Sequence, residues 1–81
     1  MSKYHQKWMP RKGQRVWYRP LNVDGAPEFQ GTVAREPWEM GQGTIVTHLV
    51  DLDANYQIQY GLKNRVPGVW VGAIRPVEDG E

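Results

Sequence analysis

The side chains that could carry out catalysis are few in this chain of 81 residues. It contains no cysteine, its only serine is Ser2, and its two histidines, His5 and His48, stand far apart. A serine or cysteine nucleophile needs a base within hydrogen-bonding reach, so this chain has almost none of the residues that an acyl-transfer site requires. The two histidines lack the spacing of a zinc motif. We therefore expect no catalytic residues, no metal and no cofactor.

Two short motifs resemble ligand-binding loops, and both fail at a required position. The run Asp51-Leu52-Asp53-Ala54-Asn55 begins like a calcium loop, but its sixth position is Tyr56 instead of glycine and its twelfth is Leu62 instead of glutamate. The run Gly41-Gln42-Gly43 lacks the third glycine of a dinucleotide fingerprint and precedes a predicted strand. We interpret Asp53-Ala54-Asn55 and Gly41-Gln42-Gly43 as turns.

The strongest functional signal is aromatic, with four tryptophans and four tyrosines. Trp17 lies between Arg15 and Arg19 in a predicted strand, and alternation puts all three on one face. An indole between two guanidinium groups could stack a nucleic-acid base, which is worth about 1–3 kcal/mol per base. The alternative is that the N-terminal segment, with Trp8, covers this face.

Three further large apolar residues are candidates for partner contact. Trp38 and Met40 fall in a predicted loop at residues 37–43, where such side chains are costly to solvate and indicate a partner or a self-contact. A lid over one end of the fold is the alternative. Trp70 stands between two inward valines and should face outward. The predicted partner-binding residues are therefore Trp17, Trp38, Met40 and Trp70.

The net charge of +1 hides an uneven distribution. Residues 20–60 hold one basic side chain against six acidic ones, whereas residues 1–19 hold basic side chains only. A basic segment of this kind indicates an anionic partner, or it neutralises the acidic body of its own chain. The candidate nucleic-acid-binding residues are Lys3, Lys7, Arg11, Lys12, Arg15, Trp17 and Arg19.

The fold class predicted from the pattern is all-β, with five or six short strands. Strands are expected at residues 14–19, 29–36, 44–52, 56–60, 69–71 and 75–78, with a polar loop at 61–68. Gly31 inside a strand suggests the tight coiling of a small barrel. The predicted organisation is a flexible basic arm at 1–12, one barrel domain at 13–78 and a frayed tail at 79–81.

The pattern Gly13-x-x-Val16, Gly31-Thr32-Val33, Val50-Asp51-Leu52, Val69 and Ile74-Arg75-Pro76-Val77 resembles SH3-like barrels of the Tudor and KOW kind. This resemblance spans roughly residues 11–78. It implies a binding module, because Tudor-like domains bind methylated side chains in an aromatic cage and KOW-like domains bind RNA or transcription proteins. Leu52, Asp53 and Ala54 stand where Tudor domains place an aromatic residue and a glycine, so one cage wall is missing.

A second resemblance is to the plasmid-type, trimethoprim-resistant dihydrofolate reductases. The turn Pro67-Gly68 is similar to one in that family, but Val69-Trp70-Val71-Gly72 follows it here. The similar run Gln57-Ile58-Gln59-Tyr60 precedes the turn instead. This resemblance implies an oligomeric reductase with one active site in a central pore.

The prediction is therefore a small, non-catalytic interaction module that binds a protein or peptide partner through exposed aromatic side chains. Nucleic-acid binding is the first alternative and an oligomeric reductase the second, and self-association is left open. The absence of cysteine, of an apolar run of about 18 residues and of a signal-peptide core favours a cytoplasmic protein without membrane contact.

Overall fold

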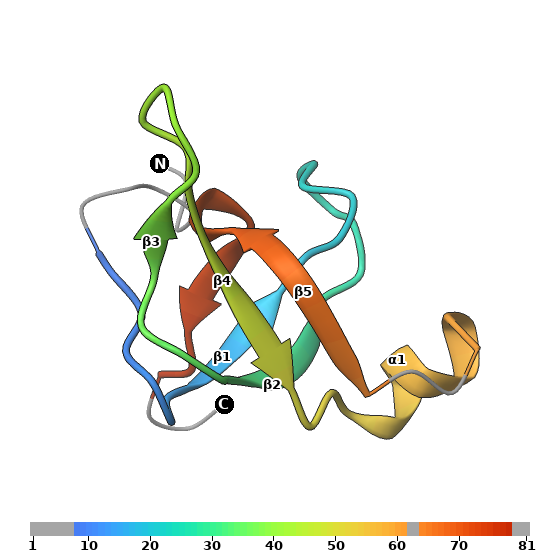
Figure 1. Cartoon of the computed structure of the whole chain (residues 1–81). Helices are drawn as coiled ribbons and strands as arrows, with labels where there is room; N and C mark the ends of the chain where they lie inside the picture. The colour runs from blue at the N-terminus through green and yellow to red at the C-terminus, as the bar shows by residue number, and fades with distance from the viewer. Residues whose placement is uncertain (1–7, 62–63, 79–81) are drawn as a thin grey trace.

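The computed structural model describes residues 8–61 and 64–78 of the chain. Its elements are strands β1 (Arg15–Tyr18), β2 (Phe29–Val33), β3 (Trp38–Glu39) and β4 (Ile45–Val50), helix α1 (Ala54–Gln59), strand β5 (Arg65–Trp70), the 3-10 helix η1 (Val71–Ala73) and strand β6 (Ile74–Pro76). The strands form one curled antiparallel sheet, a half-barrel, with α1 at one end (Figure 1). The predicted all-β class is confirmed, and the shape is compatible with an SH3-like barrel.

Strand β4 is the centre of the sheet. The strand order is β3-β4-β2-β1-β6, and β5 pairs with β4 as well. Three strands therefore pair with β4, and every pairing in the sheet is antiparallel. Because neighbouring residues of a strand point to opposite faces, β4 contributes both to the core and to the outer surface.

The core lies inside the curl and follows the alternation of the strands. On β2, Phe29, Gly31 and Val33 are buried while the residues between them are half-buried, so this alternate set faces the core. A Cβ atom on Gly31 would stand only 3.0 Å from a methyl group of Leu52, so glycine allows this close approach. The buried core cluster is Val16, Phe29, Val33, Leu49, Leu52, Tyr56, Val69 and Ile74.

The strand predicted at residues 56–60 is wrong, because this segment belongs to helix α1. The Asp53 carboxylate caps the helix, accepting a hydrogen bond from the Tyr56 N–H at 3.0 Å. Tyr56 and Tyr60 stand four residues apart and stack with ring centroids 4.6 Å apart on the core side. Ile58, predicted to share their side, is 77% exposed. Tyrosines at this spacing suit a helix face as well as a strand face, and the cap decides between them.

The predicted loop at residues 37–43 is partly wrong, because it contains β3. Trp38 and Glu39 pair with Val46 and Ile45 of β4. The true turn is shorter and is closed by hydrogen bonds from the Met40 N–H to the Thr44 carbonyl, 2.8 Å, and from the Thr44 N–H to the Gly41 carbonyl, 3.1 Å. Trp38 therefore sits on a paired strand, which fixes the side to which its indole points.

The predicted loop at residues 61–68 is also partly wrong, because β5 begins at Arg65. Pro67 and Gly68 read as a turn in sequence, but they lie within the strand, where the register to β4 shifts between Thr47 and Leu49. Gly68 has a φ of 64°, which glycine adopts without strain. Because of this bulge, Pro67 and Gly68 are accommodated within β5 instead of ending it. The last strand is predicted at residues 75–78, whereas β6 spans Ile74–Pro76, so it both begins and ends earlier than predicted.

The predicted domain division stays a prediction, because residues 1–7 and the tail at 79–81 lie outside the described residues. Of the predicted arm, Trp8 packs against the core cluster and Pro10 is fully buried. Within the part of the chain that the structure describes, no helix has the length and apolar character needed to cross a membrane.

Candidate interaction surface

The outer face of strands β3, β4 and β5 carries a row of aromatic and apolar side chains. Residues paired directly across antiparallel strands point to the same side of a sheet. Val46 pairs with Trp38 on one side and with Trp70 on the other. Thr47 and Leu49 alternate with Val46 and His48 and face inward with the core residue Val69. We call Trp38, Val46, His48 and Trp70 the outer aromatic face.

Trp70 is held in place although it is 40% exposed. Its indole lies against Gly72, where an added Cβ atom would come within 2.4 Å of the six-membered ring. Val46, between the two indoles, is only 3% exposed. The outer aromatic face is therefore a packed surface with one exposed ring, and little ordering is required before it can bind.

Trp38 contacts a cation on one side and an imidazole on the other. The guanidinium carbon of Arg35 lies 3.9 Å from the centroid of the Trp38 ring system, a cation–π contact. The ring of His48 meets Trp38 edge-on, with centroids 4.9 Å apart and planes at 65°. Trp38 is half-buried, and these two neighbours restrict the orientation of its indole.

His48 ties the outer face to the bulge in β5. The Gly68 N–H donates to Nδ1 of His48 at 3.1 Å. Because Nδ1 acts as the acceptor, the neutral ring carries its hydrogen on Nε2. The His48 side chain therefore holds the bulge in place, and among the described residues its Nε2 hydrogen has no acceptor.

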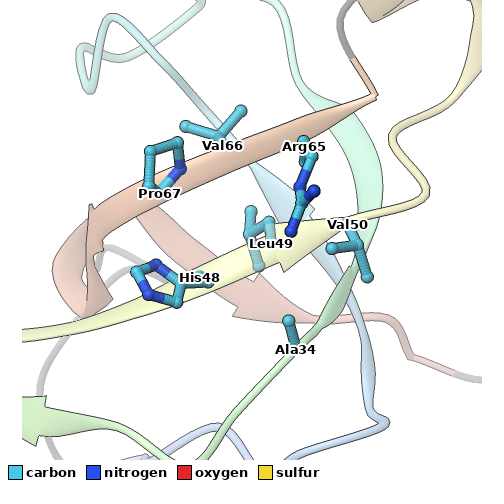
Figure 2. A pocket seen from close by; sticks show the side chains of 7 residues that line it. All are labelled: Ala34, His48, Leu49, Val50, Arg65, Val66 and Pro67. Atoms are coloured by element: carbon cyan, nitrogen blue, oxygen red, sulfur yellow. The ribbon is translucent and has the colours of Figure 1, made fainter.

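A hollow of about 420 Å³ opens beside His48, a volume within the range of small ligand sites. Figure 2 shows Arg65 reaching from β5 toward β4, with His48 at the far end. The lining is mostly aliphatic and contains no carboxylate; it comprises Ala34, His48, Leu49, Val50, Arg65, Val66 and Pro67. The hollow and the outer aromatic face share His48 and form one continuous surface.

Two arginines beside this surface differ from the other arginines of the fold. Within residues 8–61 and 64–78, neither Arg35 nor Arg65 has a hydrogen bond or ion pair through its guanidinium. The remaining arginines of the described part bond within the chain: Arg11 with Glu36, Arg19 with Asp24, Arg75 with Glu28, and Arg15 with Gln30, Thr32 and the Asp51 carbonyl. The sequence reasoning missed this difference, because ion pairing between distant residues leaves no local pattern.

The structure separates Trp17 from the other predicted partner-binding residues. Trp17 lies on β1, between Gln30 of β2 and Arg75 of β6, and β2 stands between β1 and β4. It is half-buried, Arg75 lies 5.5 Å from its ring, and its buried Nε1 has no hydrogen-bond partner among the described residues. Met40 lies beside β3 and is 65% exposed. The structure thus brings Trp38, Met40 and Trp70 to one region and leaves Trp17 on another.

The basic residues predicted to bind nucleic acid are largely occupied. Arg15 donates to Gln30, to Thr32 and, at 2.7 Å, to the Asp51 carbonyl. Arg19 is buried and lies 3.5 Å from Asp24. Arg11 lies 3.7 Å from Glu36, whose carboxylate also accepts from the backbone N–H of Lys12. Lys3 and Lys7 lie outside the described residues.

At the other end of the core, Tyr18, Tyr56 and Tyr60 form a cluster. Burial raises the pKa of Tyr18 above its ordinary value, and the neighbouring hydroxyls of Tyr56 and Tyr60 add to this. Burial and Tyr60 raise the pKa of Tyr56 as well. Among the described residues, no three His, Asp or Glu side chains gather where they could hold a metal.

Comparison of the chain with protein-family models, with curated proteins and with solved structures found no match.

Proposed function

We propose that this chain is a small, non-catalytic interaction module that binds a segment of a partner protein across the outer aromatic face and the adjoining hollow. The observation that carries the proposal is the placement of Trp38 and Trp70 on either side of Val46, next to a mostly aliphatic hollow. Binding energy at protein interfaces concentrates on tryptophan, tyrosine and arginine side chains that already sit beside pockets.

The surface suits an extended peptide better than a large folded partner. The outer aromatic face and the hollow together cross strands β3, β4 and β5, with apolar area at both ends. An extended segment can place alternate side chains against such a surface while its backbone stays solvated. Because Trp70 rests on Gly72 and Trp38 rests between Arg35 and His48, the rings lose little freedom on binding.

Occupied arginines count against the nucleic-acid alternative. Phosphate binding by Arg15 or Arg19 would require each to exchange contacts within the chain for contacts with the ligand. A base stacking on Trp17 would also have to share the ring with Arg75. On the outer aromatic face Arg35 also lies on a ring, that of Trp38, at 3.9 Å, but within the described residues neither Arg35 nor Arg65 would have to break an ion pair to bind a ligand, so we place the binding site there.

The experiment is selection of peptides from a random dodecapeptide display library on the folded chain. Peptides enriched on the wild type are then measured against Trp38→Ala, Trp70→Ala and the matched control Ile58→Ala, which removes an exposed apolar side chain from α1. Loss of a single anchoring tryptophan is expected to weaken binding by about 2 kcal/mol or more, roughly thirtyfold. The control should bind as the wild type does, and circular dichroism should show all variants folded.

Two results would contradict the proposal. One is that no peptide is enriched over a bare support, and the other is that enriched peptides bind both tryptophan variants as well as the wild type.

Titration with a mixed single-stranded oligonucleotide at low and moderate salt tests the nucleic-acid alternative. Salt-sensitive quenching of tryptophan fluorescence there, with log affinity falling by about 0.7 per phosphate contact against log salt, would favour nucleic acid.

A further inference from the structure

We infer that the segment bound at this surface is acidic, with an apolar side chain in the hollow and carboxylates on either side of it, held by Arg65 and Arg35. This inference rests on the proposed function and names the chemistry of the partner.

The hollow selects for an apolar side chain. Five of its lining residues, Ala34, Leu49, Val50, Val66 and Pro67, are apolar, and of these Leu49 belongs to the core cluster and Val66 packs against it. An apolar side chain placed there leaves the water and gains about 25 cal/mol for each Å² that it buries. A lysine or arginine side chain would lose its hydration with no carboxylate in the lining to receive it.

The charge beside the hollow is positive. Arg65 lines the hollow, and Arg35 lies on Trp38, which contacts His48 at the other end of the surface. In the part of the chain that the structure describes, neither guanidinium has a carboxylate partner, although Arg11, Arg19 and Arg75 do. An acidic segment would complete both pairs, whereas a basic one would bring like charges together without compensation.

The two arginines are also suited to carboxylates by geometry. A guanidinium presents a planar fork of donors that matches the two oxygens of a carboxylate. Stacking on the Trp38 ring at 3.9 Å restricts Arg35 before any partner arrives, so less freedom is lost when it binds. A lysine at either position would carry the same charge without this fork.

The test uses three synthetic decapeptides in which a central leucine is flanked by glutamates, by serines or by lysines. Binding to the full chain is followed by amide and indole NMR shifts. The glutamate peptide is expected to bind about tenfold more tightly than the serine peptide, as two solvent-accessible charge-assisted contacts would give. Its shifts should centre on His48, Gly68 and the Trp38 indole, and the lysine peptide should show no binding.

Two variants and one control assign the charge preference to the arginines. Arg65→Gln and Arg35→Gln should each reduce the advantage of the glutamate peptide over the serine peptide about threefold, and together they should abolish it. Lys12→Gln makes the same change in net charge at an exposed position and should leave the advantage intact. Arg65→Lys should recover part of the advantage, because it restores charge without the fork.

The outcomes separate this inference from the proposed function. If serine and glutamate peptides bind equally, or if the advantage survives in the double arginine variant, the inference is overturned while peptide binding stands. If no peptide shifts the outer aromatic face, and the display selection also fails, both fall. Displacement of the glutamate peptide from Arg65 by a short single-stranded oligonucleotide at equal concentration would also overturn the inference, because it would show phosphate to be preferred.

Discussion

Replacing Asp53 with alanine should destabilise the fold far more than its partly exposed position suggests. Each oxygen of the Asp53 carboxylate accepts a backbone N–H: Oδ1 from Tyr56 at 3.0 Å and Oδ2 from Gln30 at 3.0 Å. The Asp53 N–H in turn donates to the Gln30 carbonyl at 3.0 Å. One side chain therefore caps helix α1 and fastens it to strand β2.

The magnitude follows from these two bonds. Loss of a helix N-cap costs about 0.5–2 kcal/mol, and leaving the part-buried Gln30 N–H without its charged acceptor costs about 1–2 kcal/mol more. Together these give about 1.5–4 kcal/mol. A domain of this size has a stability on the order of 5 kcal/mol. The midpoint of thermal unfolding should therefore fall by roughly 10–25 °C for Asp53→Ala.

The assay is urea and thermal unfolding, followed by tryptophan fluorescence and circular dichroism. Asp53→Asn keeps one acceptor oxygen and should lose roughly half as much stability as Asp53→Ala. The matched control is Asp51→Asn, which removes the same charge two residues away, where the backbone has a φ of 53° that asparagine tolerates. If Asp53→Ala unfolds at the same urea concentration as Asp51→Asn, the role assigned to the carboxylate is refuted.

Three further predictions concern the surface, the tyrosines and a buried ion pair. Gly72→Ala should displace the Trp70 indole, because the new Cβ would overlap it. We expect a red-shifted tryptophan emission and peptide binding weakened at least tenfold. An unchanged emission spectrum would refute the packing of Trp70 on Gly72. Since burial raises the pKa of Tyr18, the contribution of this residue to the free energy of unfolding should be fully present below about pH 10 and should fall above it, as the unfolded chain loses a proton that the folded chain keeps. Urea titrations at rising pH should show a shallower fall for Tyr18→Phe, and an equal fall would contradict this. Glu28→Ala should lower the free energy of unfolding in urea by about 1–3 kcal/mol, because it removes the carboxylate that pairs with the buried Arg75. Glu36→Ala, whose ion pair with Arg11 is exposed, should cost less than about 1 kcal/mol. Equal costs would show that burial of the pair adds no stability.

The strands that could be predicted from sequence are those rich in β-branched or aromatic residues. Strands β1, β2 and β4 fall within the predicted ranges, and the burial of β2 alternates along the strand. Burial of one face imposes a period of two on such segments, so the pattern is local and readable. The same reasoning placed Tyr56 and Tyr60 against the core, although it gave them the wrong element.

The errors share a physical cause, which is that distant contacts override a local pattern. Asp53 reads as a turn residue, yet it caps a helix because β2 supplies a second hydrogen-bond partner for its carboxylate. Pro67 and Gly68 read as a turn, yet they form a bulge because His48 of β4 accepts the Gly68 N–H. In both places, the deciding partner lies about twenty residues away in the chain, beyond the reach of any sequence window.

The candidate surface was only partly readable for the same reason. Trp38, Met40 and Trp70 were singled out by size and placement, and the structure brings them to one region. Trp17 looked equivalent in sequence, but strand order places it elsewhere. Arg35 and Arg65 carried no signal at all, because what distinguishes them is the lack of an ion pair within the described chain.

The triple pairing of β4 has an evolutionary consequence. Removal of β3 or β6 would shorten an edge of the sheet, whereas removal of β4 would cut β3 and β5 off from the other strands. Alternate residues of this one strand, Val46 and His48 against Thr47 and Leu49, serve the outer surface and the core. Partner preference can therefore diverge most freely on the neighbouring strands and on the arginines, while β4 itself, under both demands at once, should change slowly.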